Sequence, residues 1–300
     1  MHEFRLTPPA PFGFEATAAF LSPGQDEFVD VFDGKRLTRL LDVNGRMRLV
    51  LVSSLGAEKR PELIVTLMNG TERDEPSVVQ LLQRMLGMSY DAGPFYKMCR
   101  QDQALYGLSS DFYGLKPAQR MHPFEALTLA LASSPGTHFF RTSVSRLAEA
   151  ISYRVAYAGD TFYAFPTPRV VTKSEVPAMV EGGLETRQAN QLHRLATRCM
   201  HSELDLIGLA RSATDAIIEQ LAAQDGVGLL GAQLTALLGY GRLESFPSAD
   251  PLICEWIGAN YGRPGPVEPF EAVQWAEQWG AYRGLVAFHI YAELIRDGRI

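Results

Sequence analysis

The amino-acid sequence predicts an α+β protein in which an N-terminal antiparallel β-sheet lobe precedes a mostly helical body of two lobes. Runs of β-branched and aromatic residues at strand length fall in the first third of the chain. From Pro123 onward the apolar residues recur with helical period, and a short glycine turn at Gly226–Gly228 joins two of the expected helices. We therefore expect lobes at residues 1–115, 116–240 and 241–300.

The sheet lobe is predicted from three runs of strand-forming residues and from the turns beside them. The runs are Phe28–Phe32, Met47–Val52 and Leu63–Leu67, and the turn dipeptides at or near their ends are Asp33-Gly34, Asn44-Gly45 and Asn69-Gly70. Such dipeptides favour the left-handed backbone of tight turns, and strands joined by tight turns pair antiparallel. An amphipathic helix over Pro76–Met88 is expected to follow.

The helical body is predicted from apolar residues spaced three and four positions apart. Expected helices cover residues 124–132, 142–151, 185–200 and 213–223, and we find no long strand signal in this part of the chain. Ser212 to Asp215 is predicted to form a capping box at the start of the last of these helices.

The composition is that of an ordinary globular protein. No apolar run approaches the roughly 20 residues of a membrane span, and the N-terminus lacks a signal-peptide pattern, so we expect a cytoplasmic protein. We also expect a monomer. Cys99, Cys199 and Cys254 are too dispersed for a disulfide framework, and the histidines show no metal spacing, so we expect no metal site. The net charge of −6 counts against a nucleic-acid ligand, because DNA affinity comes largely from phosphate neutralisation.

The turn Asp225-Gly226-Val227-Gly228 predicts a helix-hairpin-helix. Leu230, Leu234 and Leu237 lie on one face of the second helix, and Gly239 is its expected C-cap. The glycines allow the backbone to approach a phosphate, and the N–H groups that open the second helix can bind that anion. A corner between two helices with no ligand is the alternative, and Gly-Val-Gly alone favours that alternative.

The loop Phe246-Pro247-Ser248-Ala249-Asp250 follows the hairpin and changes that balance. A hairpin followed by a loop that ends in aspartate resembles the helix-hairpin-helix DNA glycosylase superfamily. The resemblance to its branch of 3-methyladenine DNA glycosylase II extends, in the same order, over residues 11–21, 85–88, 112–117, 123–127, 163–168 and 279–291. It implies an N-terminal sheet lobe and two helical lobes that flank a base-binding cleft.

Asp250 is the residue to which the resemblance assigns catalysis. Hydrolysis of an N-glycosidic bond places positive charge on the sugar, which a fixed carboxylate can stabilise. The base must first be flipped out of duplex DNA. Because Asp250 precedes Pro251, helix capping alone would also explain it, and the two roles are compatible. Leu230 stands where lyase members carry lysine, so the resemblance implies a monofunctional hydrolase acting on a damaged, alkylated base.

The resemblance also suggests other site residues. The residues predicted to line the base pocket are Phe20, Leu230, Leu234, Trp279, Tyr282 and Arg283. The residues predicted for the DNA-binding hairpin are Gly226, Val227, Gly228 and Gly231. The loop predicted to fill the gap left by the flipped base consists of Ser133, Ser134 and Pro135. For Phe20 and Trp279 a core position is the alternative. We expect no cofactor apart from a structural monovalent cation at the hairpin.

Three departures from the family pattern keep other functions open. Asp225 stands where the hairpin usually has proline, Ser133-Ser134-Pro135 replaces the usual glutamine-containing loop, and Leu230 and Leu234 replace stacking aromatics. A degenerate, non-catalytic homologue that binds DNA or a protein partner is therefore the alternative to an enzyme. An enzyme of the same fold acting on a free nucleoside is a third hypothesis, without positive support.

Overall fold

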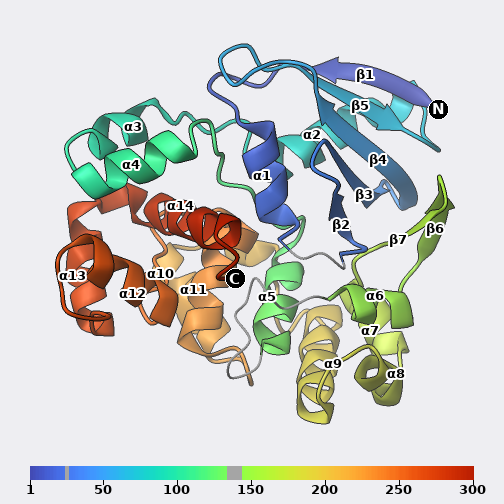
Figure 1. Cartoon of the computed structure of the whole chain (residues 1–300). Helices are drawn as coiled ribbons and strands as arrows, with labels where there is room; N and C mark the ends of the chain where they lie inside the picture. The colour runs from blue at the N-terminus through green and yellow to red at the C-terminus, as the bar shows by residue number, and fades with distance from the viewer. Residues whose placement is uncertain (24–26, 134–143) are drawn as a thin grey trace.

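The computed structural model describes residues 1–23, 27–133 and 144–300 and confirms the α+β class. An antiparallel sheet in the order β1-β5-β4-β3-β2 forms the N-terminal lobe, and helices form the rest (Figure 1). Its strands are β1 (His2–Leu6), β2 (Asp30–Phe32), β3 (Arg36–Val43), β4 (Arg46–Ser54) and β5 (Leu63–Leu67). Asn44 and Gly45, both with positive φ, make the β3–β4 turn, as the sequence predicts.

The helices run from the sheet lobe through the remainder of the described chain. They are α1 (Phe14–Leu21), α2 (Glu75–Met85), α3 (Gly93–Cys99), α4 (Gln103–Asp111), α5 (Pro123–Ala132), α6 (Ser145–Ile151), α7 (Pro168–Lys173), α8 (Val176–Glu181), α9 (Thr186–Met200), α10 (Thr214–Ala222), α11 (Gly228–Tyr240), α12 (Pro251–Asn260), α13 (Pro269–Gln278) and α14 (Arg283–Arg296). Short 3₁₀ turns occur at Glu72–Asp74, Gly208–Arg211 and Gly280–Tyr282.

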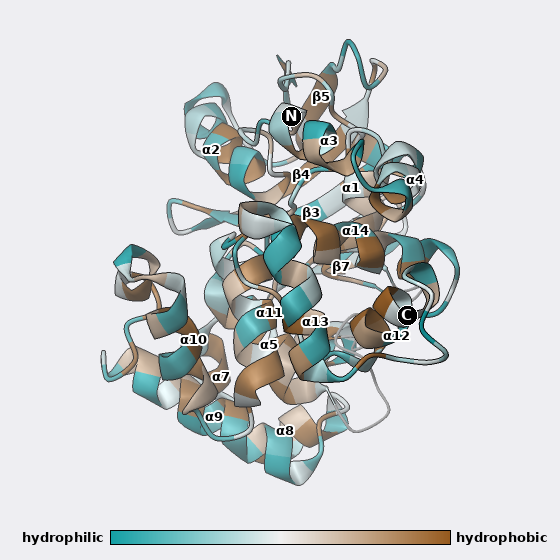
Figure 2. Cartoon of the chain, turned by 90° about the vertical axis from the view of Figure 1, so that its left-hand side faces the viewer, coloured by the Kyte–Doolittle hydropathy of each residue, from teal (hydrophilic) through white to brown (hydrophobic). Residues whose placement is uncertain are grey.

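The centre of the molecule is built around α5, α11 and α14. Figure 2 shows hydrophobic segments concentrated on α14, while outer helices such as α13 carry hydrophilic stretches. Gly239, expected to cap α11, is instead a packing position, because a Cβ there would lie 3.0 Å from the Cα of Pro123 at the start of α5. The C-cap is Gly241, which has the left-handed backbone that the cap requires.

One further sequence prediction is corrected, and the structure adds a short element that the sequence did not predict. The helical half contains a short hairpin, β6 (Arg154–Tyr157) and β7 (Asp160–Tyr163), whose strands are too brief to give a strong pattern. The capping box at Ser212 does not form, because α10 begins after Ala213 and no side chain caps it.

The β6–β7 hairpin returns to the sheet lobe. Phe162 and Ala164 pack with Leu40, Leu49 and Leu51 of strands β3 and β4 in one buried apolar cluster. The sheet lobe is therefore completed by residues from the middle of the chain. Among the described residues, no helix has the length and apolar character needed to cross a membrane.

Candidate active site

The hairpin between α10 and α11 has the backbone that its glycines predict. Gly226 and Gly228 have φ of +87° and +62°, a region that side chains rarely enter. Val227 precedes α11 as its N-cap without a side-chain cap bond, so no described side chain covers the first N–H groups of this helix. Gly231 serves packing, because a Cβ there would lie 3.0 Å from the Cβ of Ala130 on α5.

Asp225 is exposed at the tip of this hairpin and is held by two side chains of α9. Its Oδ2 accepts a hydrogen bond from Arg194 at 2.6 Å, and its Oδ1 accepts one from Gln191 at 2.9 Å. These bonds, the one from Arg194 first, lower the pKa of Asp225 below its ordinary value. The carboxylate that departs from the family pattern is thus compensated locally by an arginine.

Asp250 is fully buried at the start of α12, and both of its oxygens accept hydrogen bonds. The N–H of Leu252 donates to Oδ1 at 2.9 Å, which is the N-cap bond that the Asp-Pro pair predicts. The hydroxyl of Tyr291 on α14 donates to Oδ2 at 2.6 Å. Burial, followed by the charge of Asp250, raises the pKa of Tyr291 well above its ordinary value, so the phenol stays protonated as a donor.

Sequence reasoning missed Tyr291. The residue lies within the segment 279–291 that carries the resemblance, but nothing in a single sequence indicates that its hydroxyl reaches a residue 41 positions away. Phe20 of α1 stacks on Phe288, one turn earlier on α14, with ring centroids 3.7 Å apart. Of the predicted pocket residues, Phe20 is thus brought to the helix face that carries Tyr291.

The other predicted pocket residues lie elsewhere in the same apolar cluster. Leu234 is buried and Leu230 half-buried. Trp279 packs edge-on against Phe246, and Tyr282 packs against Phe95. Tyr282 precedes Tyr291 by more than two helical turns, so it stands at the opposite end of α14 from Asp250.

Arg283 lies at that same distant end of α14. Its Nε donates to the carbonyl of Glu244 at 2.5 Å. Arg283 therefore stabilises the loop that precedes Asp250. Ser133 ends α5, and its hydroxyl donates to the carbonyl of Leu129 at 2.8 Å. Ser134 and Pro135, the rest of the predicted gap-filling loop, lie outside the described residues.

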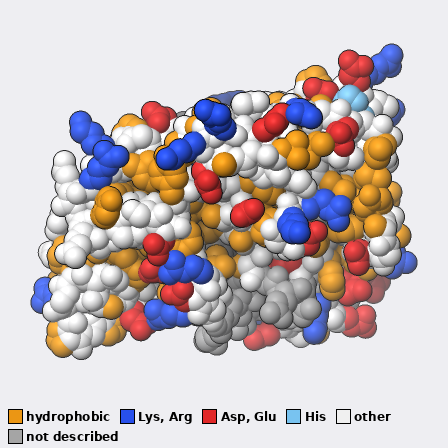
Figure 3. All heavy atoms as spheres, turned by 45° about the horizontal axis from the view of Figure 1, so that its top comes forward, with side chains coloured by type: hydrophobic (Ala, Val, Ile, Leu, Met, Phe, Trp, Pro, Cys, Tyr) orange, Lys and Arg blue, Asp and Glu red, His pale blue; other side chains and the backbone are white. Residues whose placement is uncertain are grey.

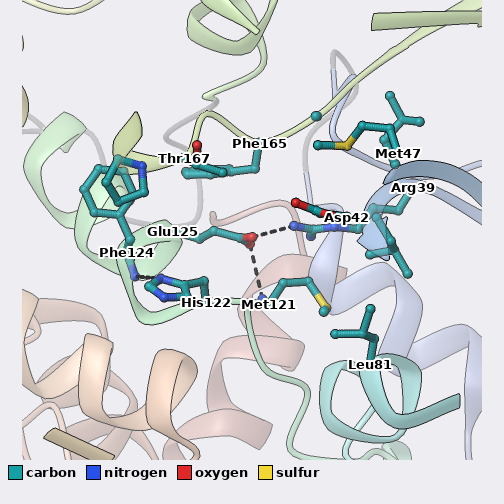
Figure 4. Close-up of a pocket in the computed structure, with 14 residues that line it drawn as sticks. Arg39, Asp42, Met47, Leu81, Met121, His122, Phe124, Glu125, Phe165 and Thr167 are labelled. Atoms are coloured by element: carbon teal, nitrogen blue, oxygen red, sulfur yellow. Dashed lines mark hydrogen bonds and ion pairs between the residues drawn. The ribbon is translucent and has the colours of Figure 1, made fainter. Parts of the chain in front are cut away.

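A second candidate site, which sequence reasoning also missed, is a cavity of about 390 Å³ between β3, β4, α5 and the segment 164–168. Figure 4 shows Glu125 extending toward Arg39 beside Phe165. Arg39 donates to Glu125 at 2.7 Å and to Asp30 at 2.5 Å, and Arg120 donates to Asp30 at 2.9 Å.

The charges at this cavity balance one another. Burial alone would lower the pKa of Arg39, but the carboxylates of Asp30 and Glu125 outweigh it and raise that pKa. Burial lowers the pKa of His122, whose Nδ1 accepts the N–H of Phe124, so this ring is neutral. Arg39 and Arg120 are paired with Asp30 and Glu125, and these ion pairs connect the sheet to α5. We therefore assign this group of charged residues a structural role. Across the described ranges, no three His, Cys, Asp or Glu side chains are grouped for a metal ion.

No protein-family model and no curated protein sequence matches the chain. Its fold is similar to that of solved DNA glycosylases over nearly the whole length of the chain. A 3-methyladenine DNA glycosylase from Archaeoglobus fulgidus superimposes with a TM-score of 0.85 at 21% identity, covering 98% of each chain.

Two DNA complexes of proteins with this fold are also similar. A protein named MBOgg1, bound to a low-affinity DNA ligand, matches with a TM-score of 0.79 at 19% identity, over 99% of this chain and 96% of that one. The 8-oxoguanine glycosylase/lyase of Clostridium acetobutylicum, with DNA containing cytosine opposite 8-oxoguanine, matches with a TM-score of 0.77 at 17% identity, over 99% of each chain. At these identities the likeness is one of fold.

Proposed function

We propose that this protein is a DNA glycosylase that hydrolyses the N-glycosidic bond of a damaged base in duplex DNA, with Asp250 as the catalytic carboxylate. The observation that carries the proposal is Asp250 itself. It is a buried carboxylate fixed by Leu252 and Tyr291, it ends the loop that follows the second helix of the hairpin, and it lies within a glycosylase fold. Phe20 stacks on Phe288 of the helix that carries Tyr291, and Phe20 is the aromatic side chain that we propose for the base pocket.

The chemistry needs a carboxylate close to the sugar of the flipped nucleotide. As the bond from C1′ to the base nitrogen breaks, its electron pair leaves with the base, and the carboxylate stabilises the cationic sugar. Water then forms the new bond to C1′, and its proton passes to solvent or to the departing base. Since Asp250 is buried in the DNA-free chain, the proposal requires that DNA binding expose its carboxylate.

We propose a monofunctional reaction on an alkylated base. Leu230 stands where lyase members of the family have lysine, and no lysine follows Lys173 in the sequence. An alkylated purine is already cationic and leaves readily, which suits a site whose proposed catalytic group is one carboxylate. A monovalent cation at the hairpin and a monomeric state remain predictions.

The test is base release from duplexes that carry 3-methyladenine, 7-methylguanine, hypoxanthine, uracil or 8-oxoguanine. We expect an abasic product from an alkylated purine, without the strand cleavage of a lyase. Asp250→Asn keeps a side-chain oxygen for the Leu252 cap bond, so it should fold, yet it should lose at least about a hundredfold in rate. Asp160→Asn, an exposed position in the β6–β7 hairpin, is the matched control.

A degenerate, non-catalytic homologue is the second candidate, and the exposed Asp225 carboxylate at the hairpin favours it. That candidate predicts no release of any base by the wild-type protein. Equal release by wild type and Asp250→Asn would instead show that Asp250 is not the catalytic group. Either result would reject the catalytic proposal.

A further inference from the structure

The helix α9 carries a row of arginines on one exposed face. Arg187, Arg194 and Arg198 are spaced by seven and four residues, which places their side chains on the same side of the helix. All three are exposed. We call these residues the α9 arginine stripe.

The stripe lies against the hairpin that precedes α11. Arg194 binds Asp225 at 2.6 Å, and Arg198 donates to Gln224 at 2.5 Å, so two consecutive hairpin residues are held by the stripe. The charge of Arg187 also contributes to the lowered pKa of Asp225. Among the residues that the structure describes, the carboxylates paired with the stripe are those of Asp225 and of Glu203, the latter 3.7 Å from Arg198.

We infer that the α9 arginine stripe is a DNA-phosphate-binding surface beside the hairpin. In the absence of DNA, the Asp225 carboxylate pairs with Arg194, and a DNA phosphate replaces that carboxylate when the duplex binds. The inference rests on the proposed function, since it takes duplex DNA as the ligand. The Arg194–Asp225 pair is more than half exposed on both sides, and exposed pairs are held weakly. A phosphate offers the guanidinium the same paired oxygens as the carboxylate.

The stripe supplies the positive charge that an acidic protein needs for DNA. Figure 3 shows another face of the molecule, where Lys and Arg are interspersed with Asp and Glu rather than gathered. At the hairpin, by contrast, Arg194 and Arg198 bind Asp225 and Gln224, which shortly precede the N-terminal turn of α11. No described side chain caps the N–H groups of that turn, and the helix dipole also favours an anion there.

The experiment measures binding to a duplex that contains a stable abasic-site analogue, by fluorescence anisotropy between about 50 and 200 mM NaCl. For each phosphate contact removed, the slope of log K against log salt should fall by about 0.9. We expect that loss in Arg187→Gln and in Arg194→Gln. Arg46→Gln, which removes an exposed arginine at the start of β4 in the sheet lobe, is the matched control and should keep the wild-type slope.

Asp225→Asn provides a second measurement in the opposite direction. Removal of the competing carboxylate should raise DNA affinity severalfold at low salt without lowering the slope. If the wild-type protein binds with a steep salt dependence and both arginine variants keep the same slope, the stripe does not bind phosphate. That result would overturn this inference and leave the proposed function intact. Absence of duplex binding by the wild-type protein would overturn both, whereas base release with unchanged slopes would overturn the stripe alone.

Discussion

Asp225 and Asp250 precede consecutive helices, yet their surroundings are opposite. Asp250 is fully buried and bonded to a backbone N–H and to the Tyr291 hydroxyl. The Asp225 side chain is 61% exposed and bonded to Arg194 and Gln191. Packing of α12 against α14 fixes the partners of the first, whereas water and salt can compete for those of the second. The same residue type is therefore a fixed part of the core in one place and an exchangeable ion in the other.

The largest difference in stability should appear between two single variants, one in which Asp250 is truncated and one in which Asp225 is truncated. Asp250→Ala removes an N-cap, worth about 1 kcal/mol, and leaves the buried Tyr291 hydroxyl without this acceptor, at about 1–3 kcal/mol, so we expect a total loss of roughly 2–4 kcal/mol. Asp225→Ala should change the free energy of unfolding by less than about 1 kcal/mol. Urea denaturation measures both, and similar losses in the two variants would remove the contrast.

The buried region around α14 and the exposed hairpin should also differ in the pH range over which they lose stability. Burial lowers the pKa of His289, on the same helix as Tyr291, from 6.5 to about 4. The unfolded chain then binds the proton more tightly, so stability falls as pH drops from about 6.5 to 4, by roughly 3 kcal/mol. Asp225, with a pKa below 3.8, contributes stability that is lost only at lower pH.

His289→Leu tests this by removing the buried imidazole. Thermal or urea unfolding between pH 4 and 6.5 should show a flatter dependence in this variant than in the wild type. Parallel curves for wild type and His289→Leu would mean that His289 does not depress acid stability.

The smallest change with a clear readout is Tyr291→Phe, which removes one oxygen atom. We expect a loss of about 1–3 kcal/mol in stability, because a buried carboxylate oxygen loses a donor. If Tyr291 positions Asp250, single-turnover base release should also fall, by about tenfold, while affinity for abasic-site DNA stays constant. Tyr106→Phe, at an exposed tyrosine of α4, is the control. Unchanged release in Tyr291→Phe would restrict the hydroxyl to a structural role.

Local features of the fold were predictable from the sequence, and contacts between distant segments were not. The Asn44-Gly45 turn and the Asp250 cap depend on adjacent residues, and both form as expected. Strand β3 escaped prediction because its residues 37–41 are buried without alternation, Arg39 included. Arg39 is buried only because Asp30 and Glu125 meet it, and no local pattern encodes a partner 86 residues away.

The same limit applies to the site. Asp250 and Phe20 were predicted from the resemblance, yet the group that joins Asp250 to α14 is Tyr291, whose contact depends on how two helices pack. The compensation of Asp225 by Arg194 likewise depends on the placement of α9 against the hairpin.

The return of the β6–β7 hairpin to the first sheet has a consequence for synthesis on the ribosome. Leu40, Leu49 and Leu51 are covered by Phe162 and Ala164, and Arg39 by Glu125. A nascent chain that has emerged only as far as residue 115 therefore exposes an apolar sheet face and an arginine that has Asp30 but still lacks its second carboxylate partner, Glu125. Such surfaces attract aggregation and chaperones. The sheet lobe is made first but can be completed only after more than half of the polypeptide has left the exit tunnel.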